Sequence, residues 1–126
     1  MALKFLLATN VCIAFLAGDS PKLRDRWLAT PSDDVALCSV VKAVLLHGAW
    51  ASADPVGNHA RLSLFFRPFV SVPFDDAAAE RRGEVVGALA KSGHPIGMAD
   101  TQIAATALAH DLTLVTRSER HFRRVK

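Results

Sequence analysis

Few residues of this sequence stand at spacings that support a known catalytic chemistry. Its five histidines show no spacing that would place two of them on one helix face as a pair of zinc ligands. Its glycines form no G-x-x-x-x-G-K phosphate loop. No serine lies in the G-x-S-x-G turn of a serine hydrolase, and Ser92 in Lys-Ser-Gly comes nearest. What remains is one well-placed acid, Asp100, at the start of a helical pattern.

The elements that must position such a residue alternate along the chain. Strand patterns cover residues 3–7, 35–38, 69–74 and 112–115. Helix patterns follow caps at Asn10 and Ser39 and begin at Pro21, His59, Asp75 and Asp100, and a last helical turn is predicted over residues 119–124. Strands that alternate with helices predict an α/β domain, with a mostly parallel sheet covered on both faces.

Length and composition suit a single domain of this kind. The chain has 126 residues, of which 51% are hydrophobic and 21% are charged, so we expect residues 1–126 to form one domain with one core. The net charge of +3 favours anionic partners only mildly. Cys12 and Cys38 lie in apolar stretches and are predicted to be buried free thiols, as in a reducing cytosol.

The first residues imitate a secretory signal, with Lys4, an apolar run and small residues up to Gly18. Thr9 and Asn10 interrupt that run, and no disulfide framework follows. We therefore predict a cytoplasmic protein, with a small secreted protein as the alternative. No other stretch approaches the roughly 20 apolar residues of a membrane helix, so no membrane association is expected.

Ligands of parallel α/β sheets bind beyond the carboxyl ends of the strands. This rule selects residues 8–10, 39–44 and 116–119, and the start of the helix at Asp100 can join them in space. A site, if the chain has one, is predicted at this edge of the sheet.

Four segments carry motifs that follow one another in a fixed order. Residues 6–13 read LLATNVCI, and residues 39–49 read SVVKAVLLHGA. Residues 95–105 read PIGMADTQIAA, and residues 112–125 read LTLVTRSERHFRRV. In order and spacing they resemble the D-T-N, S-V-x-x-A-E-L-L-x-G-A, P-I-G-x-N-D-x-x-I-A-A and L-x-L-V-T-x-x-x-x-x-F-x-x-V motifs of the VapC-type PIN-domain ribonucleases of toxin–antitoxin pairs. The resemblance covers nearly the whole chain and implies a PIN-like three-layer α/β/α fold.

The resemblance also implies a chemistry, which is metal-dependent cleavage of RNA. In such nucleases acidic residues hold Mg²⁺ or Mn²⁺, and the metal activates water and stabilises charge on the phosphate. The family's acids fall here on Ala8, Val44 and Asp100, and a last acidic or amide position falls on Ser118, with Glu119 beside it. Of the first three positions, only Asp100 keeps a carboxylate.

Polar residues that surround the metal ligands in the family fall on Thr9, Asn10 and Thr116. Hydroxyl and amide groups cannot replace two anions, and alanine and valine offer no oxygen. We therefore expect Mg²⁺ or Mn²⁺ to bind weakly or not at all, and cleavage to be absent or severely impaired. Asp100 alone also suits a purely structural role, as an acid favoured by the dipole at a helix N-terminus.

Two interpretations of function remain open. One is a VapC-type endoribonuclease toxin with inactivating substitutions; the other is a natural pseudoenzyme that binds RNA or an antitoxin without cleavage. The resemblance further implies a cognate VapB-type antitoxin, RNA as the substrate of the active form, and a homodimer.

Basic residues concentrate at the C-terminus. They are Arg117, Arg120, Arg123, Arg124 and Lys126. A solvated helix face explains such a run, and so does a patch that contacts RNA phosphates, which is the role predicted for the four arginines.

Overall fold

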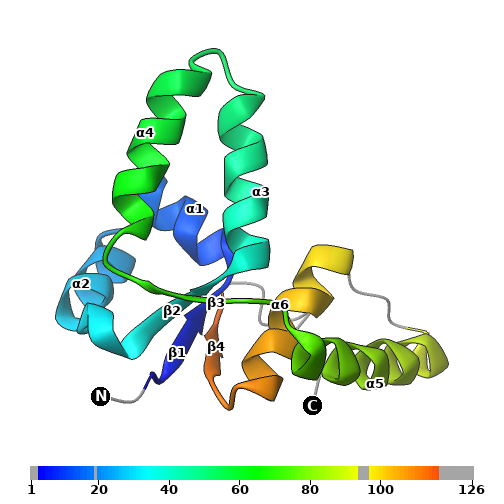
Figure 1. Cartoon of the computed structure of the whole chain (residues 1–126). Helices are drawn as coiled ribbons and strands as arrows, with labels where there is room; N and C mark the ends of the chain where they lie inside the picture. Colours follow the sequence, from blue (N-terminus) through cyan, green and yellow to red (C-terminus); the bar gives the residue numbers. More distant parts are fainter. Residues whose placement is uncertain (1–2, 19, 94–96, 117–126) are drawn as a thin grey trace.

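A parallel β-sheet organises the computed structural model, which describes residues 3–18, 20–93 and 97–116 (Figure 1). Its strands are β1 (Phe5–Leu7), β2 (Val35–Cys38), β3 (Val70–Val72) and β4 (Thr113–Val115), in the order β3-β2-β1-β4. Leu6 of β1 pairs with Ala36 of β2 on one side and with Leu114 of β4 on the other. Because all these pairings are parallel, the carboxyl ends of the strands share one edge.

Helices cover both faces of the sheet. They are α1 (Thr9–Ala17), α2 (Pro21–Ala29), α3 (Ser39–Trp50), α4 (Pro55–Phe66), α5 (Asp76–Ser92) and α6 (Met98–Ala109), with a 3₁₀ turn, η1 (Ser32–Asp34), before β2. The chain steps from β1 to β2 to β3 in one direction and returns from β3 to β4. Right-handed crossovers therefore put α1–α4 on one face and α5 and α6 on the other. The result is the predicted three-layer α/β/α fold, in which α3 and α4 project as a hairpin (Figure 1).

The core lies around the two central strands. All of β2 is buried, and Leu6 and Leu37 are fully enclosed. These strands read as continuous apolar runs because helices cover both of their faces. From the helix layers, Val41 of α3 and Ile103 of α6 complete the cluster. No described helix is long and apolar enough to cross a membrane.

The N-caps of two helices lie one or two residues before the predicted caps. Ala8 occupies the N-cap position of α1, so Asn10 lies within the first turn instead of capping it. Cys38 occupies that position before α3, and Ser39 is already helical. One residue, Ala8, separates β1 from α1, and Cys38 is both the last residue of β2 and the N-cap of α3, so neither cap position carries a side chain that bonds to the helix.

Other bounds also differ from the sequence predictions. Helix α4 begins at Pro55, four residues before His59, because the Asp54 carboxylate accepts a hydrogen bond from Gly57 N (3.2 Å) and proline suits the first helical position. Helix α6 begins at Met98 rather than at Asp100. The predicted strands 3–7, 69–74 and 112–115 are each shorter at one or both ends. The helical turn predicted over residues 119–124 lies outside the described residues.

Candidate functional site

The carboxyl edge of the sheet brings together several residues predicted to form a site. The N–H of Ala8, which follows β1, donates to the carbonyl of Val115 at the end of β4 (2.9 Å). The Thr116 hydroxyl donates to the Asn10 side-chain oxygen (3.4 Å), across 106 positions of sequence. Thr9 lies half-buried beside them in the first turn of α1. The ends of β1 and β4 and the start of α1 therefore form one polar cluster.

Ala8 lies at the centre of this edge and contributes only a methyl group. It is 2% exposed, and its backbone is extended (φ −77°, ψ 160°) at the N-cap position of α1. No side chain caps the helix there, although an acid or amide at such a position accepts a hydrogen bond from the first turn. Ala8 therefore supplies neither a metal ligand nor a helix cap.

Val44 lies on the outward side of α3. Its neighbours along the helix, Val41, Leu45 and Ala49, are buried, whereas Val44 is 38% exposed. An acid at this place would reach solvent or a ligand without desolvation of its charge. The isopropyl group present instead has no donor or acceptor atom.

Asp100 is the third residue of α6 and is half-buried. Ile103 and Ala104, one turn further on, are buried, so the spacing turns the Asp100 side chain towards the interior side of the helix. Its carboxylate has no hydrogen-bond or ion-pair partner among the described residues. Helix α6 packs against α3, so Asp100 and Val44 lie on neighbouring helices. The helix dipole favours a negative charge in this first turn.

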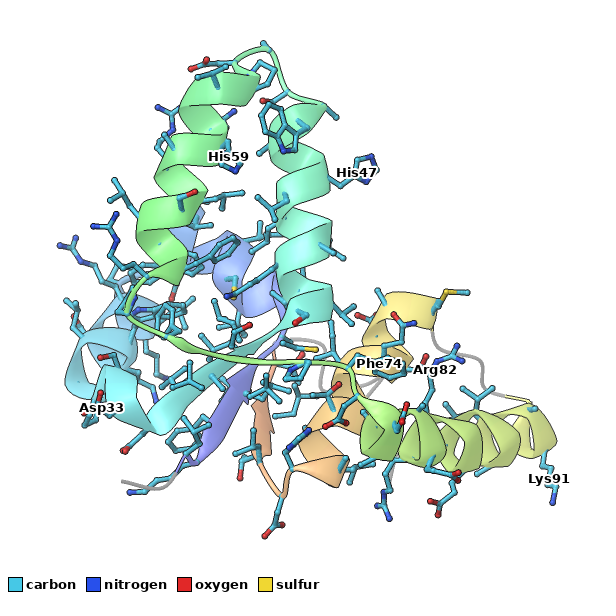
Figure 2. All side chains as sticks on the ribbon, viewed as in Figure 1. Asp33, His47, His59, Phe74, Arg82 and Lys91 are labelled. Atoms are coloured by element: carbon cyan, nitrogen blue, oxygen red, sulfur yellow. The ribbon has the colours of Figure 1, made fainter. Side chains whose placement is uncertain are left out.

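A contact that the sequence prediction missed holds the first turn of α6. Arg82 of α5 donates through Nε to the Thr101 hydroxyl (3.1 Å), which in turn donates to the Met98 carbonyl (2.8 Å). Figure 2 shows the Arg82 side chain directed from α5 towards the start of α6. The signal was present in the sequence, since Arg82 lies four residues after Ala78 and three before Val85, within the apolar stripe of α5. A cation in such a stripe indicates a polar partner on the facing helix.

These residues do not fit a magnesium or manganese ion. Among the described residues no group of three or more histidines, cysteines, aspartates and glutamates is arranged to hold a metal. The histidines among the described residues do not compensate for the missing acids. His47 and His59 lie on the α3–α4 hairpin (Figure 2), and the His110 Nε2 lies 3.1 Å from the Asp75 carboxylate at the other end of α6. With Ala8 and Val44 in place, the Asp100 carboxylate is the single anionic ligand contributed by the described family positions.

The two thiols take no part in this site. Cys12 and Cys38 are free and buried, as the sequence predicted. Burial raises the pKa of the Cys12 thiol to about 12, so it stays protonated and unreactive at neutral pH. The remaining predicted site residues lie outside the described residues. They are Ser118 and Glu119 and the predicted RNA-binding residues Arg117, Arg120, Arg123 and Arg124.

Comparison with known proteins places this geometry in a family. Residues 5–126 match the family model described as PIN domain. The tRNA(fMet)-specific endonuclease VapC of Shigella flexneri is 33% identical over 123 residues, which cover 98% of this chain and 92% of that protein. Ribonuclease VapC2 of Rickettsia felis is 28% identical, with 96% of this chain and 91% of the relative covered.

Solved structures agree with these sequence matches. The crystal structure of DNA-bound VapBC from Salmonella typhimurium contains a chain that superposes with a TM-score of 0.91 at 32% identity, covering 98% of this chain and 92% of that one. FitAcB from Neisseria gonorrhoeae superposes with a TM-score of 0.81 at 28% identity, covering 96% and 92% of the two chains. The similarity extends over almost the whole length on both sides.

Proposed function

The chain belongs to the VapC-type toxin–antitoxin ribonucleases of the PIN-domain family, and we propose that it is an endoribonuclease toxin with a cognate antitoxin, which has lost most or all of the ability to cleave RNA through substitutions at the family's acid positions. One observation carries this proposal. At the carboxyl edge of the sheet, the family's first two acid positions hold the buried methyl of Ala8 and the isopropyl group of Val44.

The loss of these acids removes the anchor of the catalytic cation. Mg²⁺ and Mn²⁺ are hard cations that take oxygen ligands, and in proteins carboxylates are what hold them against water. Thr9, Asn10 and Thr116 offer neutral oxygens, and Asn10 and Thr116 already bond to each other. Among the described residues Asp100 is the only anion at the family's acid positions, so we expect the metal to bind weakly or not at all. The cation that would activate water and stabilise charge on the phosphate is then missing.

Similarity to two-component assemblies supports a protein partner. The VapBC and FitAcB structures are named for two-component assemblies, and this chain superposes on one component over nearly its full length. We therefore propose a VapB-type antitoxin as the partner, a homodimer as the toxin unit and the cytoplasm as the location. RNA contact is assigned to Arg117, Arg120, Arg123 and Arg124, which lie outside the described residues.

A ribonuclease assay with restored acids tests the loss of cleavage. The chain itself should leave RNA intact with or without Mn²⁺. The double variant Ala8→Asp/Val44→Glu should bind Mn²⁺ and cleave RNA at a rate at least about a thousandfold higher, while each single variant should recover little because such acids act as a unit. Initiator tRNA is the first substrate to try, since the Shigella flexneri relative is named for it.

The isosteric variant Ala8→Asn/Val44→Gln is the matched control. It places groups of the same shape at both positions without charge, and its asparagine can cap α1 as an aspartate would. It should fold like the double variant but neither bind Mn²⁺ nor cleave. Equal activity of the two double variants, or efficient cleavage by the unaltered chain, would contradict the proposal.

A natural pseudoenzyme that binds RNA or an antitoxin without cleavage is the second candidate, and the packing around Ala8 is compatible with it. Ala8 is enclosed with its N–H bonded to Val115, and no buried side-chain polar atom among the described residues lacks a partner. The edge of the sheet is thus complete without the acids. If the gene from which the chain derives encodes alanine and valine at these positions, the pseudoenzyme is supported; aspartate and glutamate in the gene would show an active toxin inactivated by substitution.

A further inference from the structure

The first turn of α6, which carries Asp100, has no side-chain cap. Gly97 occupies the N-cap position and offers no side-chain oxygen to the free N–H groups of the turn. The backbone bond from Thr101 N to the Gly97 carbonyl (3.0 Å) closes the turn. Because uncapped helix ends fray, the position of this turn depends on support from outside α6.

Arg82 of α5 supplies that support through one buried hydroxyl group. Thr101 is 1% exposed, and its hydroxyl accepts a hydrogen bond from Arg82 Nε (3.1 Å) and donates one to the Met98 carbonyl (2.8 Å). Arg82 is half-buried, and its side chain extends from α5 towards the start of α6 (Figure 2). The guanidinium is planar, so a bond to its Nε fixes direction as well as distance. The contact therefore joins the two helices at the turn that carries Asp100.

Asp100 lies between the two residues that the Thr101 hydroxyl ties together. That hydroxyl binds the Met98 carbonyl, on the other side of Asp100 in the sequence, so a shift of the turn moves the Asp100 Cα with it. The Asp100 carboxylate makes no hydrogen bond or ion pair with another described residue. Its place is thus set by the backbone of the turn and, through Thr101, by Arg82.

We propose that Arg82 is a positioning residue for Asp100, which acts through Thr101 and places the Asp100 carboxylate for RNA cleavage once the two missing acids are restored. This inference rests on the proposed function, because it assigns Asp100 to the cleavage site. The chain lacks carboxylates at positions 8 and 44 but has the support that places the third acid. Restoring those acids should therefore give full cleavage only while Arg82 and Thr101 are intact.

The acid-restored variant Ala8→Asp/Val44→Glu is the background for the test, with initiator tRNA as substrate in the presence of Mn²⁺. Arg82→Met and Thr101→Val should each lower kcat by about 10- to 100-fold and change KM less than about twofold, because a misplaced group slows the chemical step more than it weakens substrate binding. The two substitutions together should lower kcat no further, since both break the same contact.

Two matched variants separate positioning from loss of charge and loss of folding. Arg81 is the exposed neighbour of Arg82, and Arg81→Met in the same background should change kcat less than about twofold. Thr101→Ser keeps the hydroxyl and should hold kcat within about threefold of the acid-restored variant. Circular dichroism at the assay temperature shows that each variant is folded, so that a lower kcat is not a smaller folded fraction.

Amide hydrogen exchange in the chain without restored acids tests the contact independently of activity. Arg82→Met and Thr101→Val should speed exchange in the first turn of α6 about tenfold, and Thr101→Ser and Arg81→Met should not. Equal kcat values for Arg82→Met and Arg81→Met would overturn the inference, and so would additive losses from Arg82→Met and Thr101→Val. If the acid-restored variant does not cleave RNA, the proposed function fails; faster exchange would then still support the placement of Asp100 by Arg82, and unchanged exchange would overturn it.

Discussion

Helices α6 and α2 cover the sheet in opposite ways. Six of the twelve residues of α6 are buried, because the helix lies between the sheet and α5, whereas no residue of α2 is buried. Helix α6 holds Asp100 in a close-packed setting, whereas α2 contacts the core only through the half-buried Leu23 and Trp27. A helix enclosed on both sides can hold a side chain in place, whereas a helix with few buried contacts opens at a lower free-energy cost.

The largest expected difference between the two helices is in side-chain truncation. Ile103 of α6 is fully buried, so Ile103→Ala should lower the free energy of unfolding by about 3–4 kcal/mol through lost burial and the cavity it leaves. Leu28→Ala on the exposed side of α2 should change it by less than about 0.5 kcal/mol. Urea denaturation measures both. Similar losses at the two positions would show that α2 packs as closely as α6 in solution.

The contact between Arg82 and Thr101 should have the next largest effect. Arg82→Met keeps most of the side-chain volume but removes the hydrogen bond to the buried Thr101 hydroxyl, so we expect a loss of about 1–2 kcal/mol. Arg81→Met is the control, because Arg81 is exposed and has no contact in this network. Hydrogen exchange should also become faster at the first turn of α6 in Arg82→Met. If exchange there is unchanged, Arg82 does not hold the turn that carries Asp100.

The contrast between α6 and α2 also separates what the sequence predicted from what it did not. The continuous apolar run of β2 predicted a buried strand, and it is buried. In the helix pattern that begins at Asp100, the apolar residues Ile103, Ala107 and Leu108 predicted an inward face; Ile103 and Ala107 are buried, whereas Leu108 is 37% exposed. The stripe of Leu23 and Trp27 predicted an inward face for α2 in the same way. Periodicity gives the direction of a face but not how deeply it is buried, so it could not predict that no residue of α2 is buried.

The sequence predicted only part of the candidate site, because motif spacing locates positions along the chain but not contacts between helices. Motif spacing assigned Ala8, Val44 and Asp100 to the family's acid positions, and the structure sets them on the edge of β1 and on two neighbouring helices. Their roles stay predictions until metal binding is measured. The motif spacing did not include Arg82. Its place in the apolar stripe of α5 indicated a polar partner but could not identify Thr101, which is 19 residues away and on another helix.

Helix caps give a third, smaller comparison. The Asp75 carboxylate accepts from Ala78 N at the start of α5 (3.0 Å) and lies 3.1 Å from the His110 imidazole at the end of α6. Ser20 caps α2 through Leu23 N alone (3.2 Å). Asp75→Ala should therefore lower stability by about 1–2 kcal/mol, and Ser20→Ala by about 0.5–1 kcal/mol. Thermal melts measure the stability of each variant alone and combined with His110→Gln. The difference between the Asp75→Ala effects with and without the imidazole shows how much of that effect depends on His110.

The smallest changes in stability are expected at two exposed glycines of α5, the helix that packs against α6. Gly83 and Gly87 lie inside the helix, and a Cβ added at either would meet no atom within 4 Å. Alanine at each position should therefore stabilise the chain by about 0.5–1 kcal/mol, since glycine loses more backbone freedom on folding. For a domain of this size each substitution should raise the melting temperature by about 2–6 °C. The sign of the stability change shows whether the outer side of α5 is exposed in solution. A gain that is independent of protein concentration means that the outer side of α5 faces solvent, as it does in the single chain. A loss that disappears on dilution would mean that a second subunit covers α5, and the proposed homodimer would then pack on the helix that holds α6 in place.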